Sequence, residues 1–112
     1  MDIKAIKNTR EFFWTSHVKY KLLQYGLSPT IVKKVIRRPE RTEEGIAPKT
    51  TAVMLRKDSK KTKKEVWVMY QKTEFKKKII SAWIYPGVSQ RGKDIYIPED
   101  VLEELNKFEN EY

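Results

Sequence analysis

The chain has 112 residues, a hydrophobic fraction of 39%, and 24 Lys and Arg against 15 Asp and Glu, which gives a net charge of +9. This length and composition predict one folded domain over residues 1–112 and argue against intrinsic disorder. The sequence contains no Cys, which excludes disulfides, thiolate nucleophiles and Cys-ligated zinc. It contains no long apolar run and no signal-like N-terminus, so we expect a cytoplasmic protein without a membrane segment.

The positive charge is concentrated outside the C-terminal segment. Residues 99–112 hold six acidic residues and one lysine, which leaves 23 basic and 9 acidic residues, a net charge of +14, on residues 1–98. A field of this size attracts polyanions, and nucleic acid is the most common polyanion of the cytoplasm. The alternative is that the lysines serve only solubility.

An aromatic segment at residues 11–15 predicts a short strand that leads into a helix. Apolar residues at helical spacing continue to Tyr25, with Thr15 or Ser16 as the N-cap and Gly26 as a left-handed C-cap. We therefore expect a short helix that stops at Gly26.

A second helix is predicted directly after the first. Ser28 is a favourable N-cap, Pro29 suits the first helical position, and the helix must end before Pro39. The two helices form an αα-hairpin.

The remaining residues predict three strands and a final helix. Strands are expected at 51–57, 65–72 and 78–85, with strict alternation of faces in the third, and a mobile charged turn between the first two. Residues 95–97 are a candidate short strand, and an acidic helix follows over 98–111. Its predicted apolar stripe consists of Val101, Leu102, Leu105 and Phe108.

These elements predict an α+β fold in which two N-terminal helices pack on an antiparallel sheet of three to five strands, with a C-terminal helix. The core of the domain is expected over residues 12–97, followed by the acidic helix. No internal repeat is present.

Four segments resemble a known group of small bacterial domains. They are residues 13–21 with the Ser16-His17 helix start, the turn at 25–28, residues 35–41, and the strand at 80–85 with its aliphatic-Ser-x-Trp-x-Tyr pattern. Domains with this pattern are similar to the RelE/ParE toxin superfamily. The chain departs from the pattern at Lys21, where Arg is usual, and at Tyr25-Gly26, where Arg-Gly is usual.

The resemblance implies a compact toxin-like fold. It also implies that the chain belongs to a toxin–antitoxin system, in which many toxins cleave RNA without a metal and are neutralised by an antitoxin. RNA and an acidic antitoxin protein are therefore the expected partners. Because a fold alone does not determine an activity, the function has to be inferred from individual residues.

His17 is the single histidine, and the start of a helix favours the neutral ring that a general base requires. For metal-independent RNA cleavage, His17 would act as the general base or the general acid. Charge on the phosphate would be stabilised by Arg37, Arg38 and Arg41. Tyr70 or Tyr85 would orient the RNA or act as the acid that protonates the leaving oxygen. The alternative for His17 is a packing and hydrogen-bonding role in the first turn of the helix. The predicted catalytic residues are His17, Arg38, Arg41, Tyr70 and Tyr85.

Basic residues recur along the second helix and in the charged turn, where they can contact phosphates. The alternative for the helix is an ordinary solvated face. The predicted nucleic-acid-binding residues are Lys33, Lys34, Arg37, Arg38, Arg41, Lys60, Lys61, Lys63 and Lys64.

Trp67 or Trp83 is expected in the core, because most aromatic residues on strands fill it. A single His and no Cys predict no metal site, and the scattered glycines predict no phosphate-cradling loop and no cofactor. Two functions stay open. One is an RNA-interacting toxin-like domain, with metal-independent endoribonuclease activity as its candidate reaction, and the other is a non-catalytic nucleic-acid- or protein-binding module on the same fold.

Overall fold

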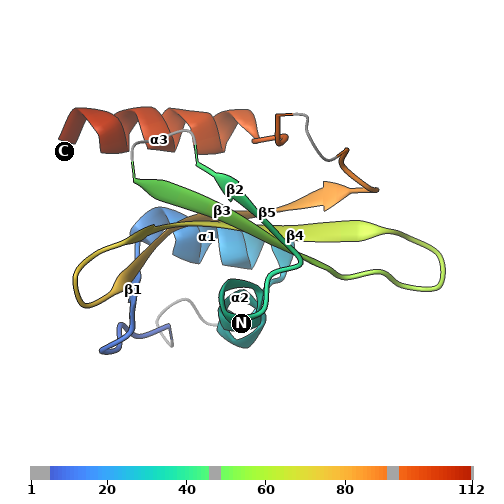
Figure 1. Ribbon diagram of the computed structural model, residues 1–112, viewed down its shortest axis with the longest axis horizontal. Helices are drawn as coiled ribbons and strands as arrows, with labels where there is room; N and C mark the ends of the chain where they lie inside the picture. The colour runs from blue at the N-terminus through green and yellow to red at the C-terminus, as the bar shows by residue number, and fades with distance from the viewer. Residues whose placement is uncertain (1–5, 46–48, 91–93, 112) are drawn as a thin grey trace.

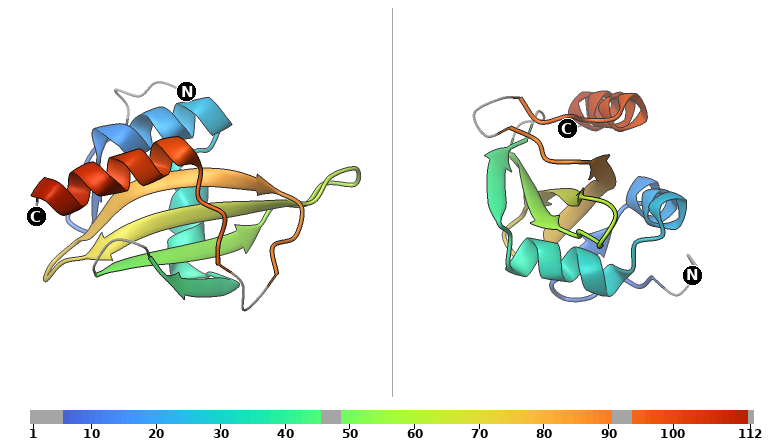
Figure 2. Two further views of the ribbon diagram at one scale, coloured as in Figure 1. Left: turned by 90° about the horizontal axis from the view of Figure 1, so that it is seen from above. Right: turned by 90° about the vertical axis from the view of Figure 1, so that its right-hand side faces the viewer.

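The computed structural model describes residues 6–45, 49–90 and 94–111. In chain order the helices and strands are β1 Phe12–Trp14, α1 Ser16–Tyr25, α2 Pro29–Arg37, β2 Arg41–Glu44, β3 Thr50–Arg56, β4 Lys64–Lys72, β5 Lys77–Pro86 and α3 Glu99–Glu111. The α+β class, the two short N-terminal helices and the three central strands predicted from the sequence are confirmed, but α1 and α2 lie crosswise and do not form an αα-hairpin (Figures 1 and 2).

The strands form one five-stranded sheet in the order β1-β5-β4-β3-β2 (Figure 1). The segment β2 to β5 is an antiparallel meander, but β1 lies parallel to β5, with Phe12 opposite Lys77. The prediction of a purely antiparallel sheet is therefore wrong. The two helices connect β1 to β2, which lies at the opposite edge of the sheet. The meander then brings β5 back beside β1, and the two strands run in the same direction.

The helices cover both faces of the sheet (Figures 1 and 2). α2 crosses one face and α1 runs along the β1–β5 edge, and their apolar residues share one core with β1 and with one face of the central strands. α3 lies on the other face, where Val101 and Leu105 pack on a second core that includes Trp67 and Trp83. These two indole rings are stacked, with centroids 6.2 Å apart.

The helix ends follow the caps seen in the sequence. The Thr15 hydroxyl accepts from the Val18 N–H, and the Ser28 hydroxyl accepts from the Ile31 N–H. Gly26 ends α1 at φ 65°, a left-handed conformation that glycine adopts without steric cost.

Three sequence predictions need correction. The polar strand β2 was not predicted, because Arg-Thr-Glu-Glu lacks the apolar alternation that identifies a half-buried strand. Residues 95–97 do not form a strand. Leu102 is exposed, so the buried stripe of α3 consists of Val101 and Leu105; the side chain of Phe108 lies outside the described residues.

A bulge in β5 changes which side chains face α3. Tyr70 pairs with Ile79 and Met69 pairs with Ser81, so Ile80 has no partner residue on β4. Consequently Ile79 packs in the α1–α2 core on the same face as Ala82, whereas Ile80 packs under α3 on the same face as Trp83. Strict alternation along residues 79–85 was therefore wrong, since a β-bulge inserts one extra residue.

Candidate functional site

His17 lies where α1, the β5 bulge and α3 meet. Its Nε2 is 2.9 Å from the Ser81 hydroxyl, and its Nδ1 is 3.9 Å from a Glu104 carboxylate oxygen. The preceding Thr15 hydroxyl lies 3.0 Å from the carbonyl oxygens of both Ile79 and Ile80, and thus ties the start of the helix to the bulge.

The surroundings of His17 keep its ring neutral. Burial lowers the pKa of His17 below its ordinary value of 6.5, although the nearby Glu104 carboxylate opposes this effect. We assign the proton to Nδ1, which faces Glu104, so that Nε2 accepts from the Ser81 hydroxyl. The series Ser81, His17 and Glu104 has the order of a hydrolytic triad, but Ser81 is 0% exposed and no substrate can reach its hydroxyl.

An open pocket of about 420 Å³ lies beside His17. Its lining combines polar, cationic and aromatic side chains from the segment before β1, from β1, α1, β5 and α3, among them Asn8, Phe13, Ser16, Lys19, Lys78 and Glu104. Arg38, Arg41, Tyr70 and Tyr85 do not line this pocket.

Lys21 lies one helical turn after His17 and is buried, with 2% of its surface exposed. Its ammonium forms an ion pair with Asp100 of α3, donates to the Gln24 side-chain oxygen at 3.1 Å and lies 4.9 Å from the centre of the Tyr25 ring. The hydrogen bond from Lys21 holds the pKa of Asp100 below its usual value. This buried cation therefore fastens the first turn of α3 to α1.

Asp100→Asn should lower the free energy of unfolding by about 1–3 kcal/mol, because it leaves the buried Lys21 ammonium without its anionic partner. Lys21→Met removes that charge and keeps an apolar chain of similar length, so adding Asp100→Asn to Lys21→Met should cost less than Asp100→Asn alone. Urea unfolding measures all three variants, with Glu103→Gln on the same helix as the control. Equal costs of Asp100→Asn in both backgrounds would contradict the ion pair.

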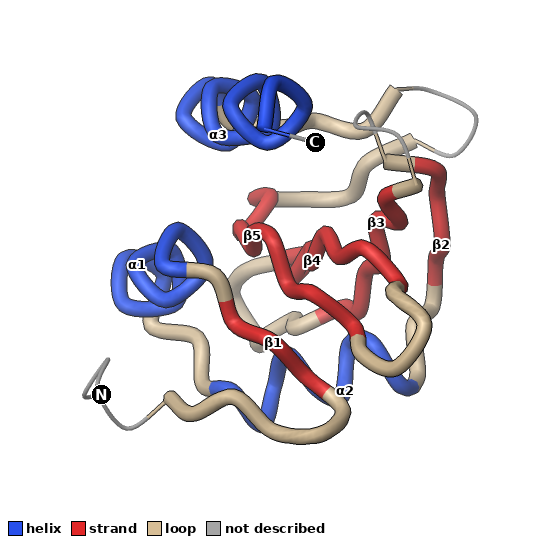
Figure 3. Tube along the Cα trace, turned by 90° about the vertical axis from the view of Figure 1, so that its left-hand side faces the viewer, coloured by secondary structure: helices blue, strands red, loops and turns tan. Residues whose placement is uncertain are grey.

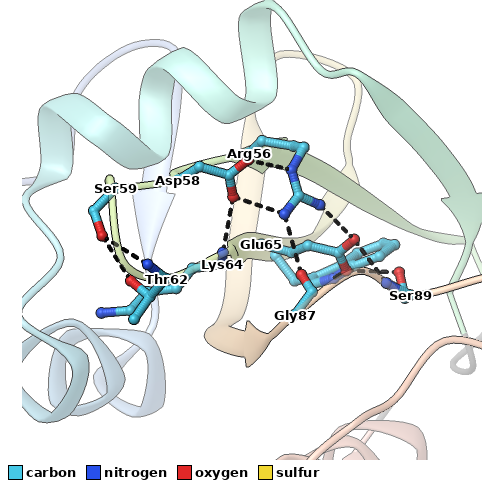
Figure 4. Close-up of polar contacts among 9 residues, drawn as sticks. Arg56, Asp58, Ser59, Thr62, Lys64, Glu65, Gly87 and Ser89 are labelled. Carbon is cyan, nitrogen blue, oxygen red and sulfur yellow. Dashed lines mark hydrogen bonds and ion pairs between the residues drawn. The ribbon is translucent and has the colours of Figure 1, made fainter.

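A second polar network lies at the opposite end of the sheet, at the base of the β3–β4 hairpin (Figure 4). The Glu65 carboxylate is 1% exposed and accepts from the Ser89 hydroxyl at 2.6 Å, from the Ser89 N–H and from the Trp67 ring N–H. Arg56 donates to Glu65 at 3.1 Å, to both carboxylate oxygens of Asp58, and to the Gly87 carbonyl. One guanidinium thus joins both strands of the hairpin to the end of β5.

The tip of this hairpin is hydrogen-bonded, in contrast to the mobile turn predicted from its charge. The Ser59 N–H donates to the Thr62 carbonyl, the Thr62 N–H donates to the Ser59 hydroxyl, and Asp58 accepts from the Lys64 N–H. Every lysine of the tip is exposed. These residues are Lys57, Lys60, Lys61, Lys63 and Lys64.

The basic face of α2 is also exposed to solvent and forms a shallow depression lined by Lys33, Lys34, Arg37 and Arg38. A narrow groove of about 170 Å³ separates α2 from the sheet, and Lys34 and Lys57 both line it. This groove places Lys34, a predicted phosphate-binding residue of α2, beside Lys57 at the start of the hairpin loop. We call the α2 face and the hairpin tip together the basic surface.

Three predicted site residues lie elsewhere. Arg41 is 6% exposed on the edge strand β2, where its guanidinium donates to Glu43, to the Ser89 hydroxyl and to the Gln90 carbonyl and lies 5.3 Å from the Trp67 ring centre. Tyr70 packs on the α1–α2 core and Tyr85 on the α3 core, on opposite faces of the sheet. The five predicted catalytic residues are therefore not gathered around one pocket.

Sequence reasoning missed several residues of these sites. Glu104 was predicted only as part of the acidic C-terminal helix, and nothing in the sequence shows that α3 lies across His17. Lys57 was not counted among the predicted binding residues, although its position at the end of a predicted strand, next to the charged turn, indicated that it belongs with them. Lys78 was assigned to a strand, and its place beside the pocket depends on the β1–β5 pairing.

In the part of the chain that the structure describes, no three His, Asp or Glu side chains are grouped closely enough to hold a metal ion. No helix within those residues is long and apolar enough to cross a membrane. Comparisons with protein-family models, curated proteins and solved structures find no match. The resemblance to RelE/ParE toxins therefore stays a prediction.

Proposed function

We propose that this protein binds RNA through the basic surface formed by α2 and the β3–β4 hairpin tip. The observation that carries this proposal is the groove in which Lys34 of the helix and Lys57 of the hairpin lie together. Two elements that are separate in sequence thereby offer phosphate-binding cations on one continuous surface.

The construction of the hairpin supports a binding role. Arg56, Asp58 and the Ser59–Thr62 turn hold the loop closed before any ligand arrives, so the exposed lysines lose little backbone entropy on binding. On α2, Arg37 forms an ion pair with Glu11, whereas no acidic residue is found among the described residues that line the depression of Lys33, Lys34, Arg37 and Arg38.

Metal-independent RNA cleavage, the activity implied by the toxin resemblance, is a second candidate. It is favoured by the neutral ring of His17 and by Lys19 and Lys78 in the adjacent pocket. Against it, both ring nitrogens face protein groups, Ser81 and Glu104, and the predicted Arg and Tyr partners lie outside the pocket. Binding without cleavage is therefore the better supported function.

Binding of labelled RNA, measured by fluorescence anisotropy between 50 and 200 mM salt, tests the proposal. Four or more phosphate contacts predict that log K falls with log salt at a slope of about −3 or steeper, because each contact to a single strand contributes about 0.7. Parallel incubation with RNA, with and without Mg²⁺, followed by gel analysis, tests for cleavage. A DNA strand of the same sequence distinguishes RNA from nucleic acid in general.

The outcomes separate the candidate functions. RNA that stays intact but binds with a steep salt slope supports the binding module. Cleavage that His17→Ala lowers by about a hundredfold, with binding retained, would favour the endoribonuclease. No RNA affinity at 50 mM salt would contradict both and leave an acidic protein, such as an antitoxin, as the partner of the basic surface.

A further inference from the structure

The β4–β5 turn carries an unusual side chain at the end of the sheet opposite the β3–β4 hairpin. Among the described residues, Phe75 is the most exposed large apolar side chain, with 80% of its surface accessible. The turn that holds it is closed, because the Thr73 N–H donates to the Lys76 carbonyl at 2.7 Å and the Lys76 N–H donates to the Thr73 hydroxyl at 3.1 Å. The aromatic ring is therefore displayed on a structured turn.

Apart from the adjacent and exposed Glu74, the charged neighbours of Phe75 are cationic. Lys72 and Lys76 are exposed on either side of it, and the half-buried Lys77 begins β5 with its N–H bonded to the Glu11 carbonyl. An apolar protein partner or a bilayer core would favour a contiguous apolar patch, whereas a lone ring among lysines suits a ligand with flat bases and phosphates.

A second exposed ring stands at the start of β5. Phe13 of β1 is in register with Lys78, whose ammonium lies 5.9 Å from the Phe13 ring centre. Both side chains line the pocket beside His17. Figure 3 looks onto this end of the molecule, where β1 lies beside β5 and leads into α1. Lys78 follows Phe75 by three residues in the sequence, so the chain between them spans at most about 10 Å.

The pocket beyond Phe13 offers groups suited to a base edge. The amide of Asn8, the hydroxyl of Ser16 and the carboxylate of Glu104 supply hydrogen-bond donors and acceptors, and the volume of about 420 Å³ has room for a nucleobase. The Asn8 side-chain oxygen accepts from the Trp14 N–H at 2.8 Å, which fixes its orientation.

We propose that Phe75 and Phe13 form a stacking site for single-stranded RNA, with one base on Phe75 and a neighbouring base at Phe13 over the His17 pocket. The surrounding lysines contact the phosphates between these bases. This inference rests on the proposed function and extends it, because it assigns the substrate class as single-stranded rather than duplex RNA.

The basic surface and the stacking site are joined by α2. The cations of Lys33 and Arg37 lie 5.8 and 5.5 Å from the ring centre of Phe12, the residue before Phe13, and Arg37 also pairs with Glu11. An RNA strand whose phosphates contact α2 would therefore continue past the start of β1 to the β4–β5 turn.

Phe75→Leu is the decisive variant, because it keeps an apolar side chain and removes the aromatic face. Its affinity for a short oligouridine should fall about 5- to 150-fold, the range for loss of one stacked base, with the salt slope unchanged. Phe75→Tyr should bind within about twofold of the wild type, since its ring still stacks. Affinity for a duplex RNA with the same number of phosphates should not change in either variant.

Phe75→Trp adds a direct reporter of contact. The three native tryptophans are at most 2% exposed, so the new indole is the one that oligouridine can quench and protect from acrylamide. Tyr96→Trp, at an exposed position beside Tyr85 near the end of β5, is the matched control and should respond weakly.

Unchanged oligouridine affinity in Phe75→Leu, with the steep salt slope intact, would overturn the stacking site and leave the proposed function standing. Equal loss of oligouridine and duplex affinity would also overturn it, since stacking requires unpaired bases. A protein that binds neither RNA contradicts the proposed function itself. If Phe75→Leu weakens binding to lipid vesicles or to an acidic protein but leaves oligouridine affinity unchanged, the ring belongs to another partner and the stacking site is overturned.

Discussion

Glu65→Ala should lower the free energy of unfolding by about 3–5 kcal/mol, the cost of removing one member of a buried ion pair. The Glu65 carboxylate accepts hydrogen bonds from Arg56, from the Trp67 ring N–H and twice from Ser89, and all of these donors would lose their acceptor. Urea unfolding followed by the fluorescence of the buried tryptophans measures the change. A loss below about 1 kcal/mol would contradict this role of Glu65.

The same carboxylate predicts a pH dependence. Burial by itself raises the pKa of Glu65, but the hydrogen bonds from Ser89 and Trp67 and the charge of Arg56 outweigh it, so the pKa lies below the ordinary value of 4.5. Since the unfolded chain binds this proton more readily, the stabilisation is present above pH 4.5 and is lost as the pH falls below it. Glu65→Gln should flatten this loss, whereas the exposed control Glu44→Gln should behave as the wild type.

Removal of four cations from the basic surface should reduce RNA affinity by about 10²–10³-fold at 0.1 M salt. Each phosphate contact to a single strand contributes about 0.7 to the salt slope, so four contacts change the RNA binding constant by about 2.8 powers of ten for each tenfold change in salt concentration. The variant combines Lys60→Gln and Lys61→Gln at the hairpin tip with Lys34→Gln and Arg38→Gln on α2. Anisotropy titrations at several salt concentrations measure both the affinity and the slope.

The matched control separates a defined surface from net charge. Lys49→Gln with Lys107→Gln removes two charges from exposed positions outside the basic surface, as Lys60→Gln with Lys61→Gln does within it. The hairpin pair should lower the salt slope by about 1.4, and the control pair should leave it nearly unchanged. Equal effects of the two pairs would mean that RNA senses only the total charge of the protein.

The elements with strong local signals were predictable from the sequence. Thr15, Ser28, Pro29 and Gly26 mark helix ends through side-chain caps and backbone preferences that act within a few residues, and the structure places the helices there. The central strands were predictable for the same reason, because their apolar residues recur between clear turns.

Long-range relations were not predictable in this way. The parallel β1–β5 pair joins residues 65 positions apart, and the bulge at Ile80 reverses the faces that alternation assigns. These two features place Ser81 against His17, and the packing of α3 on the sheet adds Glu104, so the surroundings of His17 could not be inferred from its position at a helix start. Arg41 shows the same limit, because its charge suggested a phosphate contact while the fold buries it beside Trp67.

The parallel pairing of β1 also sets an order of events during synthesis. Phe12 and Trp14 leave the ribosome early, but their partners at 77–79 follow only after about 65 further residues, or roughly 3–13 s at ordinary elongation rates. The meander β3–β4–β5 needs only short loops to close and can form as soon as it emerges. Until then the two aromatic side chains have no sheet to join, so the nascent β1 segment exposes apolar surface that a chaperone can protect.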